Sequence, residues 1–283
     1  MSADPYLYRD TMTMPVEGDL SMGRHQLLWE DPATGATVQM TYGSPGFSPK
    51  VVELLAHGAH RHYHNTVIER HYVLGGDYPV WHWSDLEDEG KLSILRRHTY
   101  LENPPKTLHG IRPETLPKIA SQILVWNNGS GTSVFEADAP KETIEVPLQG
   151  HATPKIGWDS PRLLIMDDLP WRPHPRIKGW KIKKVASRAK DLPPVVLVNI
   201  PADSKGGAKP PSFPGAPRYW IFVLSGDLSV NLSSAGQASE LSLREGHFLA
   251  WPKETTLSYR KESISDGGCV CICVGHDLAQ SRR

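Results

Sequence analysis

The pattern of hydrophobic and polar positions predicts short strands separated by turns. Six segments of the first half are rich in β-branched and aromatic residues, and several alternate between apolar and polar positions. These segments are residues 38–42, 51–56, 71–74, 80–83, 121–126 and 143–146. No long segment repeats its apolar residues at helical spacing. We therefore predict an all-β fold.

A second series of similar segments follows, which indicates two related halves. Its members are residues 180–185, 195–200, 219–224, 228–232, 246–251 and 270–274. Between the two series, residues 151–179 mix proline, tryptophan and charged residues, as a connection does. We expect a first domain at 1–155 and a second at 156–283.

Composition narrows the classes of partner. The 283 residues suffice for two domains of ordinary size, and the 24 glycines and 25 prolines suit a fold with many turns. Lys plus Arg equals Asp plus Glu at 31 each, so no nucleic acid or membrane partner is indicated. The N-terminus has no apolar run of the kind a signal peptide needs, and no segment is long enough to span a membrane. We expect a cytoplasmic protein that acts on a small molecule.

The histidines are concentrated in the first half, where ten of the thirteen precede residue 156. His62 and His64 share one face of an extended segment, because side chains alternate with period two. Glu69 follows after four residues, enough for a turn that returns a carboxylate beside them. His109 ends a proline-containing loop, and only the fold can bring it to the other three.

These residues carry a specific resemblance. His62, His64, Glu69 and Gly76 match the first motif of the cupin family, HxHx(4)Ex(6)G, and residues 104–109 are similar to its second motif, PxGxxH. Lys106 departs from the second motif, because it stands where glycine is usual. The resemblance implies two tandem cupin barrels, also called double-stranded β-helices or jelly rolls. It also implies one metal site built from the three histidines and Glu69.

The second half resembles the family more weakly. Residues 218–227 and 245–252 look like the corresponding strands. Three residues fall at the first motif's ligand positions, namely Ser212, Pro214 and Tyr219, and either Thr256 or Leu257 falls at the last. The resemblance therefore implies a bicupin whose C-terminal domain is degenerate and metal-free. Bicupins often associate through their sheets, so a homodimer is compatible with it.

The ligand set limits the metal without choosing it. Three imidazoles and a carboxylate suit Fe(II), Mn(II), Ni(II), Cu(II) or Zn(II), and we expect Fe(II) from the frequency of cupin dioxygenases. Four protein ligands leave positions open for substrate or dioxygen. The favoured hypothesis is a dioxygenase acting on a small organic molecule, of aromatic or dicarbonyl type. The alternatives are a non-redox lyase, decarboxylase or isomerase, and a small-ligand sensor.

Further residues near the motif are candidates for the reaction. His71 lies two residues after Glu69 and is the first acid/base candidate, with Tyr72 as the second. Trp81 and Trp83 share one strand face and form an apolar wall beside the metal if that face points inward. The alternative to a functional role is, for each of these residues, a structural place in the core of the barrel. Three cysteines at 269, 271 and 273 also share a face, and we interpret them as core residues rather than a metal or redox site.

Overall fold

The structure is a computed structural model. It describes residues 6–17, 24–32, 34–43, 62–64, 66–83, 89–111, 121–129, 133–135, 161–175, 177–186, 194–202, 218–234, 237–252, 255–259 and 266–274. The predicted strands at 51–56 and 143–146 lie outside the described residues. Within them, no helix has the length and apolarity needed to cross a membrane. The elements found are strands apart from one short 3-10 helix, η2 (Met166–Asp168), so the all-β prediction is confirmed.

The chain divides into two compact units. The first in sequence, which we call the histidine unit, is Pro15–Asp168, and the other, which we call the cysteine unit, joins Met1–Met14 to Leu169–Arg283. The N-terminal segment belongs to the cysteine unit because β1 (Leu7–Asp10) pairs with β18 (His247–Pro252) in an antiparallel ladder. We retain 1–155 and 156–283 as a proposal for the limits of the two repeated barrels.

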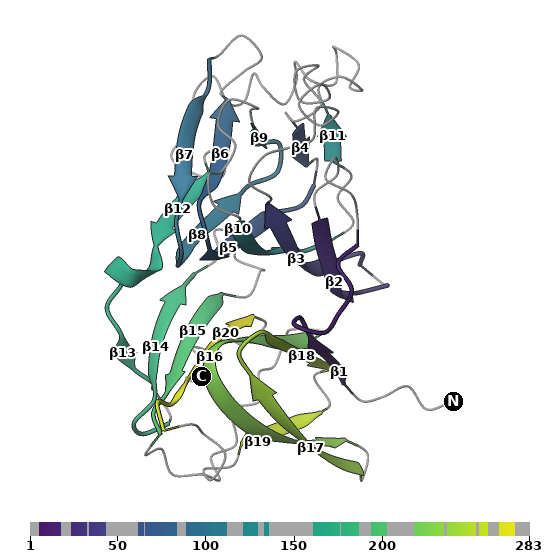
Figure 1. The fold of residues 1–283 in the computed structure, drawn as a ribbon, viewed down its shortest axis with the longest axis vertical. Coiled ribbons are helices and arrows are strands. Elements are labelled where there is room, and N and C mark those ends of the chain that lie inside the picture. Colours follow the sequence, from purple (N-terminus) through teal and green to yellow (C-terminus); the bar gives the residue numbers. More distant parts are fainter. Residues whose placement is uncertain are drawn as a thin grey trace, which may run out of the picture. The chain divides into compact units, whose positions relative to one another are not determined.

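In its described residues, the histidine unit forms two antiparallel sheets (Figure 1). The six-stranded sheet has the order β12 (Arg162–Ile165), β8 (Thr99–Asn103), β5 (Glu69–Gly75), β10 (Ser121–Asn127), β3 (Thr37–Gly43) and β2 (Arg24–Glu30). The five-stranded sheet has the order β11 (Ser133–Phe135), β4 (His62–His64), β9 (Leu108–Gly110), β6 (Tyr78–Trp83) and β7 (Lys91–Leu95).

The inner faces of these two sheets pack on each other. Val73 and Leu101 from the six-stranded sheet meet Val80 and Leu95 from the other in one buried cluster. Because side chains alternate along a strand, Glu69 and His71 lie on the same face of β5 as Val73. The polar side chains of β5 that matter for chemistry therefore extend this core rather than face solvent.

The cysteine unit is built around one long strand, β16 (Arg218–Ser234). Its main sheet has the order β1, β18, β16, β20 (Cys269–Val274), β15 (Val195–Ile200), β14 (Lys181–Val185) and β13 (Arg172–Pro173). Two further strands, β17 (Gln237–Arg244) and β19 (Thr256–Tyr259), pair with the second half of β16.

The two strands predicted at 219–224 and 228–232 are one continuous strand in the structure. The register of β16 against β20 shifts between Val223 and Ser225, and Gly226 has a φ of 75°. Such a bulge bends a strand without ending it, and glycine adopts the left-handed conformation without steric cost. Gly226 therefore lies where β16 changes from the partners β18 and β20 to the partners β17 and β19.

Candidate metal centre

Three imidazoles converge at the end of the five-stranded sheet. His62 and His64 lie on one face of β4, while Tyr63 between them points the other way and is buried. The antiparallel pairing of β4 with β9 sets His62 directly opposite His109. Nitrogen atoms of the three rings all lie within 4.8 Å of one another. This span is comparable to the roughly 4.2 Å that separates two trans ligands bound at about 2.1 Å.

Glu69 approaches these rings from the facing sheet. Its Oε1 lies 3.3 Å from Nε2 of His64, and its Oε2 lies 3.0 Å from Nε2 of His109. Two ligands bound at right angles and at about 2.1 Å lie about 3.0 Å apart, so the spacings are those of neighbouring ligands of one cation. The structure thus brings all four predicted ligands together.

The hydrogen bonding of His109 supports a cation at this point. Its Nδ1 lies 2.8 Å from the backbone oxygen of Thr107, which accepts and so places the ring proton on Nδ1. Nε2 of the neutral ring then carries a lone pair, and it makes no hydrogen bond within the described part of the chain. A lone pair directed at a carboxylate oxygen 3.0 Å away is repulsive unless a proton or a metal cation lies between them. The donor set therefore fits a borderline divalent metal.

The electrostatics of the cluster keep Glu69 ionised. Burial by itself raises the pKa of this carboxyl, but the charge of His71 and the contacts with His109, His64 and His71 outweigh it, and the pKa lies well below its usual range. Burial lowers the pKa of His64, yet the hydrogen bond and charge of Glu69 more than compensate, so the net shift is upward. A carboxylate and neighbouring imidazoles are thus available as ligands once protons are displaced.

His71 lies beside the four predicted ligands. Its Nε2 is 2.8 Å from Oε2 of Glu69, and the side chain is buried on the inner face of β5. The ring also packs near Tyr78, whose hydroxyl has a pKa raised by burial and by the charge of Glu69. His71 is therefore placed where an acid/base residue for this site would be needed.

The structure does not bring Tyr72, Trp81 and Trp83 to the cluster, which corrects their predicted roles. Tyr72 lies on the opposite face of β5 from Glu69, where its hydroxyl is 3.0 Å from Nδ1 of His98. The two tryptophans stack on each other, with ring centroids 6.2 Å apart, on the face of β6 opposite His82. Because His82 faces the cluster, the period-two alternation of β6 directs both indoles away from it.

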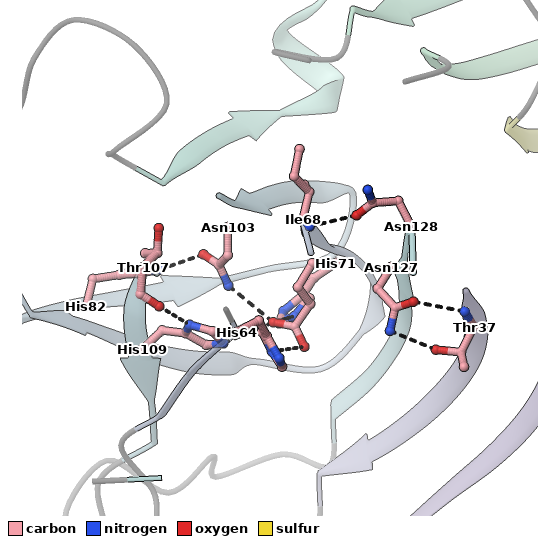
Figure 2. Close-up of polar contacts among 11 residues, drawn as sticks. Thr37, His64, Ile68, His71, His82, Asn103, Thr107, His109, Asn127 and Asn128 are labelled. Carbon is pink, nitrogen blue, oxygen red and sulfur yellow. Dashed lines mark hydrogen bonds and ion pairs between the residues drawn. The ribbon is translucent and has the colours of Figure 1, made fainter. Parts of the chain in front are cut away.

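Two polar residues of the cluster, His82 and Asn103, lie outside both sequence motifs. His82 is the cross-strand neighbour of His109, and Asn103 is that of Glu69. Nε2 of His82 lies 3.0 Å from Oδ1 of Asn103, and Nδ2 of Asn103 donates to Oε2 of Glu69 at 3.3 Å (Figure 2). Only the pairing between strands places both residues at the cluster, and neither belongs to a local sequence motif.

The loop before His109 places Lys106 in a backbone conformation that suits glycine. Lys106 has a φ of 64°, the left-handed conformation that glycine adopts freely. Its backbone N–H donates to the oxygen of His64 at 2.7 Å, which ties the loop to β4. The departure at Lys106 therefore leaves His109 in place.

The corresponding region of the cysteine unit is apolar in its described part. Tyr219 is buried in a large hydrophobic core, Leu257 packs against that core, and Thr256 is exposed. Ser212 and Pro214 lie outside the described residues. The core also contains the three thiols.

The thiols of β20 are buried. Sγ of Cys269 lies 3.4 Å from Sγ of Cys271, and this hydrogen bond together with burial raises the pKa of Cys269. Burial also raises the pKa of Cys273. The arrangement is that of small apolar core residues rather than reactive thiolates.

Solved structures share this fold. Oxalate decarboxylase of Bacillus subtilis, described with Mn(II) centres, is 14% identical with a TM-score of 0.59, over 97% of this chain and 78% of that one. A Pseudomonas aeruginosa protein designated as glyoxylate-induced is 12% identical with a TM-score of 0.64, over 100% and 92%. HEPD of Streptomyces albus, solved with its substrate 2-hydroxyethylphosphonate and Fe(II), is 8% identical with a TM-score of 0.61, over 95% and 75%.

These likenesses confirm the predicted all-β cupin fold. At such low identity they establish the fold alone. No protein-family model and no curated protein sequence matches the chain.

Proposed function

We propose that the histidine unit is a metal-dependent cupin enzyme that acts on a small organic molecule. Its site would hold one divalent transition metal through His62, His64, Glu69 and His109. The observation that carries the proposal is the convergence of three imidazoles from β4 and β9 on a carboxylate from the facing sheet, at ligand-to-ligand spacings.

The surrounding residues support a catalytic rather than a structural site. Four protein ligands leave one or two positions of a five- or six-coordinate cation for substrate. A bound Fe(II) would supply redox chemistry with dioxygen, whereas Mn(II), Zn(II), Ni(II) or Cu(II) would polarise a carbonyl as a Lewis acid. His71, at 2.8 Å from Glu69, is the group we propose to accept or return a proton of the substrate.

The lining of the site favours a polar substrate. With Trp81 and Trp83 directed away, the groups next to the predicted ligands are His71, His82 and Asn103. A small carboxylate or dicarbonyl compound that chelates the cation suits these groups better than an aromatic ring does.

Two reaction classes follow from this site. We propose dioxygenase chemistry with Fe(II) first, because the ligand set leaves positions for substrate and oxygen together. Non-redox decarboxylase or lyase chemistry is the second candidate, and the buried His71 beside the ligands favours it because such reactions need a proton donor. The fold shared with a Mn(II) oxalate decarboxylase and with an Fe(II)-bound HEPD is compatible with both.

The cysteine unit would then be a degenerate cupin barrel without metal, which gives structural support. Its apolar interior in the described residues supports this proposal. A homodimer and a cytoplasmic location remain proposals of the same kind.

Elemental analysis of the purified protein, beside the His64→Ala variant, tests the proposal. We expect near one metal per chain in the wild type and little in the variant. The metal-loaded protein is then assayed with small carboxylates and 2-oxo acids, for oxygen consumption with Fe(II) and for carbon dioxide release without oxygen with Mn(II). Equal metal content in the two proteins would refute the proposed site. Binding of a small acid without turnover in either assay would support the sensor alternative.

A further inference from the structure

Two asparagines flank Glu69 at the same level of the six-stranded sheet. Asn103 on β8 and Asn127 on β10 are both its direct cross-strand neighbours. They differ in what they bind. Asn103 donates to Oε2 of Glu69, whereas Asn127 exchanges hydrogen bonds with the backbone and hydroxyl of Thr37, at 2.9 and 3.0 Å (Figure 2).

Asn103 is itself held by His82 from the facing sheet. Since Nδ2 of Asn103 donates to a carboxylate, its Oδ1 is free to accept, and Nε2–H of His82 donates to it at 3.0 Å. An amide oxygen only accepts, so the proton of this hydrogen bond lies on Nε2 of His82. The chain of donors therefore has one direction, from His82 through Asn103 to Glu69.

We propose that Asn103 and His82 are positioning residues that orient the Glu69 carboxylate toward the metal. This inference rests on the proposed function. The hydrogen bonds from His82 to Asn103 and on to Glu69 link the two sheets. His82 lies opposite His109 on β9, while Asn103 lies opposite Glu69 on β5. The hydrogen-bonded path thus ties the carboxylate of Glu69 to the residue of β6 that is paired with His109.

The chemistry of the amide explains why asparagine suits this position. A carboxylate at 103 would repel Glu69, and an apolar residue would remove the amide donor that fixes Oε2 from the side of β8. Asn103 is 1% exposed, so water does not replace the lost donor. Groups that hydrogen-bond to metal ligands typically change metal affinity about 10- to 100-fold when removed.

The test compares Asn103→Leu with the matched control Asn127→Leu, using Mn(II) as the probe. Free Mn(II) is measured by electron paramagnetic resonance to obtain Kd, and the spectrum of bound Mn(II) reports ligand geometry. We expect Asn103→Leu to weaken binding at least about tenfold and to alter the bound spectrum. We expect Asn127→Leu to change neither, even if both variants melt at lower temperature.

A double-mutant cycle tests whether His82 acts through Asn103. His82→Leu should weaken Mn(II) binding in the wild-type background and add nothing in the Asn103→Leu background. His82→Gln retains an N–H donor and should recover the wild-type spectrum. If Asn103→Leu fails to fold, the comparison of His82→Leu with His82→Gln still tests the hydrogen-bonded path, because both variants keep Asn103.

The outcomes separate this inference from the proposed function. The positioning role alone would be overturned if the wild type binds Mn(II) and Asn103→Leu has the same affinity and spectrum. It would also be overturned if the losses of Mn(II) affinity in His82→Leu and Asn103→Leu were additive in the double variant. A wild-type protein that binds no divalent metal would overturn the proposed function and the positioning role with it.

Discussion

Replacing Lys106 by glycine is expected to stabilise the histidine unit without changing its site. The residue has a φ of 64°, where the side chain's Cβ is too close to the following carbonyl oxygen. Its backbone N–H donates to His64 at 2.7 Å, so the loop cannot relax to another conformation without losing that bond. Glycine removes the steric conflict and keeps the bond.

The magnitude follows from two opposing terms. A non-glycine residue in the left-handed region costs about 1–2 kcal/mol. Glycine loses more conformational freedom on folding, which costs about 0.5–1 kcal/mol. The net gain in the free energy of unfolding is therefore about 0.5–1 kcal/mol. For a protein of this size, that raises the melting temperature by about 1–4 °C.

Differential scanning calorimetry of the metal-free protein measures this effect, with Lys106→Ala as the control. Alanine removes the same exposed side chain but keeps the Cβ, so the difference between the two variants isolates the backbone term. Mn(II) affinity should be the same in all three proteins. If Lys106→Gly melts no higher than Lys106→Ala, the conformational argument is refuted.

Three further predictions concern the site and the thiols. Glu69→Gln should reduce metal affinity more than about 100-fold, because the loss of a ligand weakens binding more than the loss of a residue that only hydrogen-bonds to a ligand. Circular dichroism should show that the fold is retained, and unaltered metal content would contradict the prediction. In the metal-free protein, Glu69 contributes stability above about pH 4.3, and this contribution is lost as the pH falls through its lowered pKa. His64 contributes stability below about pH 6.5, and this contribution is lost as the pH rises through its raised pKa. The stability difference between wild type and His64→Leu in urea should therefore be larger at pH 5.5 than at pH 8.5, and an equal difference would count against the pairing. The three buried thiols should react with a disulfide reagent only after denaturation, because burial covers all three and raises the pKa of Cys269 and Cys273. Fast labelling of the native protein would argue for a reactive site.

Strand alternation and motif spacing were the informative signals in the sequence. The strands at 38–42, 80–83, 121–126, 195–200 and 270–274 lie within strands of the structure, because their β-branched and aromatic residues pack on a half-buried surface. The spacing of His62 and His64 anticipated their convergence, because a period of two places both on one face of β4.

The same alternation could not say which face of a strand points inward. Trp81 and Trp83 share a face, as predicted, but the pairing of β6 with β9 turns that face away and directs His82 to the cluster. The same reasoning explains Tyr72, which is one residue out of phase with Glu69 and His71.

The sequence by itself determined the all-β class and identified the four residues that converge on one point, because the class depends on local periodicity and the four residues belong to two short motifs. Only the tertiary structure decided what surrounds that point. The contacts of Glu69 with Asn103, of Asn103 with His82, and of β1 with β18 join residues that are far apart in the chain. Such contacts depend on the register between strands, which hydrogen bonds across the sheet set and no single segment encodes.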